Sequence, residues 1–174
     1  MDITKEDLKE IFAQAVKQSH NHQTKAVPCK EVMNPTILSV EYGTDLGETW
    51  QLFEQYDVHG IPVVDTFQRL MGIVTISDFI RYATQFYGSD KESKDVSSQI
   101  ARLCRKTPGF ESDKPEVTGQ IMSHPVIFAK EDDLVGNLMP LFSQHDIHHI
   151  PVVDDRRKLK GMLTYNNIMS ANNN

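Results

Sequence analysis

Residues 59–65 read HGIPVVD, and residues 148–154 read HHIPVVD. Extended in both directions, the two stretches become a longer match, in which residues 32–80 align without a gap with residues 121–169 at a constant offset of 89. Fifteen of the 49 aligned positions are identical, where about three would be expected from average composition. The chain therefore contains an internal duplication.

Each copy predicts the order strand, helix, strand, strand, helix. In the first copy the strands are predicted at residues 37–40, 61–64 and 69–75, where short β-branched and apolar runs follow turn residues. A helix is expected to begin after a cap at Thr44 or Asp45, because Leu46, Trp50 and Phe53 recur at helical spacing. Ser77 and Asp78 are predicted to cap a second helix that reaches residue 87.

The second copy predicts the same elements, with one exception. Pro140 falls inside the helix expected from Leu134, so that helix is predicted to be kinked or short. Outside the copies, an apolar stripe predicts an amphipathic helix over residues 4–19, and one helix is expected at 96–105. The predicted organisation is an N-terminal helix and linker (1–28), repeat 1 (29–88), an insert (89–117) and repeat 2 (118–174).

The composition excludes several classes of protein. With 18 basic and 24 acidic residues the net charge is −6, so a broad nucleic-acid-binding surface is not expected. No apolar run approaches the length of a membrane span, and the polar N-terminus lacks a secretory signal, which predicts a cytoplasmic chain. Cys29 and Cys104 have no CxxC spacing and are expected to be ordinary thiols.

The duplicated motifs resemble a tandem pair of CBS domains, the family named for cystathionine β-synthase. Each copy has a methionine near its start and then an amphipathic helix. The motifs H-x-I-P-V-V-D and L-x-G-h-h-T follow, where x is any residue and h is a hydrophobic residue. The resemblance implies an α+β fold of two β-α-β-β-α repeats in one pseudo-symmetric module. The flanking stretches ITKEDLKEIF, VPCKEVM and VTGQIMSHPV are similar to the cytoplasmic C-terminal part of HPP-type membrane proteins, which would make this chain a fragment.

The family resemblance also implies an adenosine site at the motif G-h-h-S/T-x-x-D. Residues 72–78 fit this motif, with Thr75 and with Asp78 expected to accept hydrogen bonds from ribose hydroxyls beside a helix N-terminus. In the second copy Thr164 is kept, but Asn167 replaces the aspartate, so the two sites are expected to be unequal. The alternative is that Ser77 and Asp78 only cap the helix.

The resemblance assigns further residues to the ligand. His148 and His149 are expected to face the phosphate at the Asp78 site, and His59 the Asn167 site, although these imidazoles could instead be structural. The adenine is expected to lie against apolar and turn residues that could equally be plain core. These residues are Thr36, Ile37, Ile61 and Pro62, with the second-copy counterparts Val126, Ile150 and Pro151.

Metal binding and catalysis have little support, because the His-rich stretch 145–149 lacks a third ligand nearby and no catalytic motif occurs. We therefore expect a non-catalytic regulatory module that needs no cofactor and binds an adenine nucleotide. AMP is favoured over ADP, ATP and S-adenosylmethionine. A homodimer is expected through the helices carrying Leu52, Phe53, Leu141 and Phe142. The alternative is a structural dimerisation module without a ligand.

Overall fold

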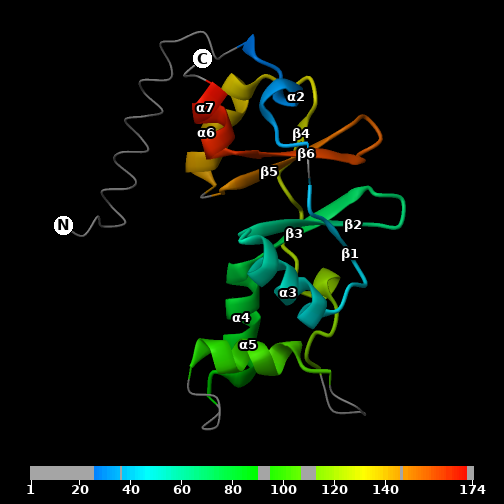
Figure 1. The fold of residues 1–174 in the computed structure, drawn as a ribbon, viewed down its shortest axis with the longest axis vertical. Coiled ribbons are helices and arrows are strands. Elements are labelled where there is room, and N and C mark those ends of the chain that lie inside the picture. Colours follow the sequence, from blue (N-terminus) through cyan, green and yellow to red (C-terminus); the bar gives the residue numbers. More distant parts are fainter. Residues whose placement is uncertain (1–25, 36, 90–94, 107–112, 146, 172–174) are drawn as a thin grey trace, which may run out of the picture. The chain divides into compact units, whose positions relative to one another are not determined.

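The structure, a computed structural model, describes residues 26–35, 37–89, 95–106, 113–145 and 147–171 (Figure 1). The helix predicted at residues 4–19 lies outside them. The chain forms two compact units: unit 1 comprises Met1–Ile37 and Ile127–Asn174, and unit 2 comprises Leu38–Val126. Each unit is described by itself. Within the described part of the chain, no helix is long and apolar enough to cross a membrane.

Unit 2 contains a three-stranded sheet in the order β1-β2-β3. Strand β1 (Val40–Glu41) runs parallel to β2 (Gly60–Val64), and β2 is antiparallel to β3 (Leu70–Thr75). The strand predicted over residues 37–40 was wrong in extent, because pairing with β2 begins only at Val40. The residues up to Ile37 belong to unit 1.

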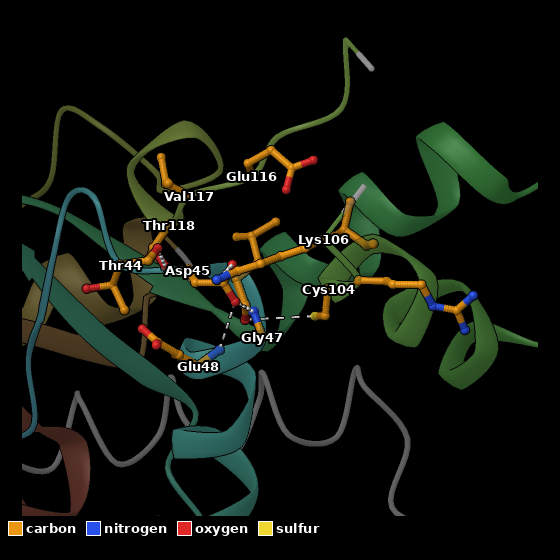
Figure 2. Close-up of polar contacts among 12 residues, drawn as sticks. Thr44, Asp45, Gly47, Glu48, Cys104, Lys106, Glu116, Val117 and Thr118 are labelled. Carbon is orange, nitrogen blue, oxygen red and sulfur yellow. Dashed lines mark hydrogen bonds and ion pairs between the residues drawn. The ribbon is translucent and has the colours of Figure 1, made fainter. Parts of the chain in front are cut away.

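Three α-helices accompany this sheet (Figure 1): α3 (Leu46–Tyr56), α4 (Ile76–Tyr87) and α5 (Val96–Cys104). Of the two predicted caps, Thr44 and Asp45, the structure has Asp45 as the N-cap of α3. Its side chain accepts hydrogen bonds from the backbone N–H groups of Gly47 and Glu48 (Figure 2). Phe53 of α3 and Phe79 of α4 meet edge to face, with ring centroids 5.8 Å apart. Apolar burial of this kind holds the helices on the sheet.

The insert contributes α5 to the core of unit 2. Its Ile100 and Leu103 are buried in the same apolar cluster as Phe53 and Phe79. The Cys104 thiol donates to the Leu46 carbonyl at the start of α3, over 3.8 Å (Figure 2). The helix predicted at 96–105 is therefore present, and it is an integral part of the repeat that precedes it.

Unit 1 repeats this architecture. Its sheet has the order β4-β5-β6, with β4 (Ala129–Lys130) parallel to β5 (His149–Val153) and β5 antiparallel to β6 (Leu159–Thr164). The strand pairs keep the 89-residue offset, since Val63 faces Gly72 in unit 2 and Val152 faces Gly161 in unit 1. Among its described residues the helices are α2 (Cys29–Val32), α6 (Val135–Gln144) and α7 (Tyr165–Ala171), and α6 continues through Pro140.

In each unit, the segment that precedes the first strand of one repeat pairs with the last strand of the other repeat. We call this the leading segment. In unit 2, which also holds the 3₁₀ turn η2 (Thr118–Gln120), Ser123 exchanges backbone hydrogen bonds of 2.8 and 3.2 Å with Ile73 of β3. In unit 1, Asn34 exchanges bonds of 2.9 and 3.0 Å with Met162 of β6. The repeats of the sequence and the compact units of the structure therefore have different boundaries.

The apolar residues that motivated the homodimer expectation are used inside the units. Phe53 and Phe142 are buried in the two cores, and Leu52 and Leu141 pack against them. Phe53 and Phe142 thus stabilise their own unit, whereas Leu52 and Leu141 are half-buried, and the homodimer stays a prediction.

Candidate functional site

The G-h-h-T-x-x-D motif of the first repeat spans the end of β3 and the start of α4. Thr75, the last residue of β3, is the N-cap of α4, and Asp78 is its third helical residue. Asp78 Oδ2 accepts from both the backbone N–H and the hydroxyl of Thr75 at 2.9 Å, while Thr75 Oγ1 accepts from the Asp78 N–H at 3.3 Å. This is a capping box. The prediction that Ser77 shares the cap was wrong, since Thr75 is the N-cap and Ser77 is already the second helical residue.

The second carboxylate oxygen of Asp78 has two other partners. Asp78 Oδ1 accepts from Arg81 Nη2 at 2.7 Å, one helical turn along α4, and from Ser123 Oγ at 3.0 Å. The Asp78 side chain is 6% exposed, whereas that of Arg81 is 58% exposed. A buried carboxylate is stable only when it is paired, and Arg81 supplies the opposite charge. Sequence reasoning missed both Arg81 and Ser123.

The second repeat keeps the geometry of the motif and loses its charge. Asn167 Oδ1 accepts from the Thr164 N–H at 3.1 Å and from the Thr164 hydroxyl at 2.7 Å, as Asp78 Oδ2 does in the first repeat. The position that corresponds to Arg81 holds Ser170. The two motifs therefore differ in charge rather than in backbone shape.

The three candidate histidines lie at equivalent turns. His59 and His148 are exposed in the bends that precede β2 and β5, and His149 is half-buried as the first residue of β5. His149 is in register with Thr164 across the β5-β6 pair. Because His148 and His149 belong to unit 1 and Asp78 to unit 2, their joint action on one ligand stays a prediction. His59 and His148 are exposed, and both the phosphate role and the alternative of an imidazole that only hydrogen-bonds the turn stay predictions.

The residues that were expected to lie against the adenine differ in burial. Ile61 and Ile150 are fully buried in the two cores, and Pro62 and Pro151 are buried beside them in the central strands. Ile37 belongs to unit 1 and Ile61 to unit 2, so their joint contact with one adenine stays a prediction. Val126 is half-buried and belongs to unit 2, with Asp78. Thr36 lies outside the described residues.

Both cysteines have a thiol pKa that is raised by burial. Burial is the main cause that raises the pKa of the Cys29 thiol from 9.0 to about 12, with a further contribution from the charge of Asp133. Burial, then the charge of Asp45, likewise raises the pKa of Cys104 to about 12. Both are therefore protonated at neutral pH and poorly nucleophilic. Among the described residues no group of three or more His, Cys, Asp or Glu side chains could hold a metal ion.

Comparison with known proteins identifies the class of this fold and motif. The family model of the CBS domain matches residues 29–84 and 117–174. The chain belongs to the CBS domain family, as a tandem pair of repeats with a mixed α+β fold.

Individual relatives are more distant. The chain is 26% identical over 149 residues to inosine-5'-monophosphate dehydrogenase of Methanocaldococcus jannaschii; the match covers 85% of this chain but 24% of the dehydrogenase. The chain therefore spans about a quarter of that relative's length.

Two solved structures share the fold. The crystal structure of CBSX2 in complex with AMP has a TM-score of 0.64 at 20% identity, covering 83% of this chain and 94% of CBSX2. The CBS domain of a CBS domain-containing membrane protein from Sphaerobacter thermophilus has a TM-score of 0.62 at 23% identity, covering 94% of this chain and 96% of that one. At these identities the similarity establishes the fold.

Proposed function

We propose that this chain is a non-catalytic regulatory module that binds an adenine nucleotide, with AMP as the favoured ligand, through the motif of the first repeat. One observation carries the proposal: a buried carboxylate, Asp78, stands in the first turn of α4, directly after a strand. A carboxylate there can accept from both ribose hydroxyls, and the helix N-terminus favours the phosphate. The AMP complex of the structurally similar CBSX2 supports this choice of ligand.

The two repeats are proposed to bind unequally. Asn167 is a neutral counterpart of Asp78, and hydrogen bonds to an ionised acceptor are about twice as strong as bonds between neutral groups. We assign the phosphate at the Asp78 site to His148 and His149, and the weaker site to His59 beside Asn167. This assignment rests on the family resemblance.

Calorimetric titration with AMP tests the proposal on the intact chain. Asp78→Ala is expected to abolish tight binding, because both ribose acceptors are lost, whereas the matched variant Asn167→Ala is expected to change the affinity little. Circular dichroism of each variant controls for the loss of a capping interaction. Equal losses in the two variants would contradict the unequal sites, and unaltered binding by folded Asp78→Ala would refute the assignment of Asp78.

The location, the oligomeric state and the regulated domain are also proposals. We propose that the module works in the cytoplasm as a homodimer and controls an attached HPP-type membrane domain. The likeness to the CBS region of a membrane protein from Sphaerobacter thermophilus supports the attachment. Ile80 of α4 and Val96 of α5 are exposed apolar side chains, and we propose them as part of the dimer contact.

A further inference from the structure

All acceptor positions of the Asp78 carboxylate are already occupied. Oδ2 takes two hydrogen bonds from Thr75, and Oδ1 takes one each from Arg81 and Ser123. A carboxylate offers about four acceptor positions. A ribose diol, which brings two further donors, therefore has to replace two of the present ones.

The four donors are not equally replaceable. The Thr75 N–H is fixed where β3 turns into α4, and the Thr75 hydroxyl is held on both sides, since it donates to Oδ2 and accepts from the Asp78 N–H. Arg81 and Ser123 are both exposed, so each can exchange Asp78 for water. The Arg81 guanidinium also lies 4.8 Å from the Tyr82 ring centroid, a contact that does not depend on Asp78. Oδ1 is thus the oxygen whose partners can change.

The second repeat lacks both members of the Asp78–Arg81 ion pair. Where the acid is replaced by the neutral Asn167, the base is replaced by the neutral Ser170. A buried carboxylate needs a counter-charge and a neutral amide does not. This paired difference fits a role for Arg81 as the resident partner of the Asp78 carboxylate.

We propose that Arg81 and Ser123 occupy the ribose position on Asp78 Oδ1 in the ligand-free protein, and that a nucleoside binds by displacing both of them. The inference rests on the proposed function. Ser123 belongs to the first segment of the second repeat and is tied to β3 through Ile73. Displacement removes the side-chain bond between this segment and α4, and this loss is the change that occupancy of the first motif would impose on the second repeat.

Titration calorimetry with adenosine, which has the ribose diol and no phosphate, tests the displacement. Arg81→Met is expected to bind adenosine about fivefold more tightly than the unaltered chain, because no ion pair has to be broken. Arg69→Met is the matched control: it removes another 2.7 Å ion pair, with Asp65, at a similarly exposed arginine, and should leave the affinity unchanged. Binding of 2′,3′-dideoxyadenosine, which cannot replace donors on Asp78, should not respond to Arg81→Met.

Ser123→Ala provides a second, structurally milder variant, for which a smaller gain in adenosine affinity is expected. Unchanged or weaker adenosine binding by both Arg81→Met and Ser123→Ala, while the unaltered chain binds AMP, would overturn the displacement and leave the proposed function standing. Absence of AMP and adenosine binding in the unaltered chain and in both variants would overturn the proposed function, and the displacement with it.

Discussion

Gly72→Ala is expected to push the segment around Ser123 away from β3. A Cβ at this position would lie 2.7 Å from Met122 Sδ and 2.8 Å from the Ser123 carbonyl oxygen. Carbon contacts are optimal at about 3.5 Å or more, so the segment would have to retreat by roughly 0.7 Å. The same carbonyl accepts from the Ile73 N–H at 3.2 Å, at the long end of the usual range, so a retreat would weaken this bond. Overpacking of this kind costs about 2 kcal/mol.

Differential scanning calorimetry of the ligand-free chain measures this cost. A loss of about 2 kcal/mol corresponds to a fall of roughly 6 °C in melting temperature for a chain of this size. Gly161→Ala is the matched control, because its Cβ would meet mainly the movable Met33 Sδ, at 2.3 Å, while the nearest backbone oxygen, of Asn34, is 3.1 Å away. A Gly72→Ala protein as stable as the unaltered chain, or more stable than Gly161→Ala, would refute the reasoning.

Two further predictions concern buried groups. Lys114→Met should lower the free energy of unfolding by about 1–3 kcal/mol, because the buried ammonium donates to the carbonyls of Leu103 and Arg105. The exposed Lys130→Met should leave the melting temperature almost unchanged, and equal effects of the two would contradict this account. For Cys29 and Cys104, whose folded-state pKa values are raised from 9.0 to about 12, the stabilising contribution is complete below pH 9. It is expected to be lost between pH 9 and 12, as the unfolded chain releases protons that the folded chain keeps. Alkylation at pH 8 should accordingly be slow until denaturant is added, and fast modification of the native chain would disprove the burial argument.

The fold was predicted well from the duplicated sequence, because each copy shows apolar residues at helical spacing and turn residues before its strands. The helix beginning at Leu46, the strand around Ile61 and the helix of the insert all follow from local patterns, and the structure confirms them. The IPVVD motif, however, had an unpredicted role at its last residue. Asp65 Oδ1 accepts from the N–H groups of Phe67 and Arg69 and so closes the β2-β3 turn, and Asp154 does the same for β5-β6.

The candidate site was predicted only in part, for a physical reason. Thr75 and Asp78 are three residues apart on one capping box, so the sequence places them together directly. Ser123 reaches Asp78 from 45 residues away, through an exchange of leading segments that no local pattern encodes. Arg81 was within reach of sequence reasoning, because a base three residues after an acid on a helix faces it.

The exchange of leading segments has a consequence for synthesis of the chain. Unit 2 is continuous from Leu38 to Val126, so every residue it needs has left the ribosome before the second repeat is complete. Unit 1 joins the segment up to Ile37 to the residues from 127 onward, and Asn34 can pair with Met162 only after more than 120 further residues have been synthesised. During that interval the segment around Asn34 lacks its partner strand β6, whereas the corresponding segment around Ser123 emerges after its partner strand β3 is complete. The order of synthesis thus allows the unit that contains Asp78 to fold first, and the unit that contains Asn167 is completed afterwards.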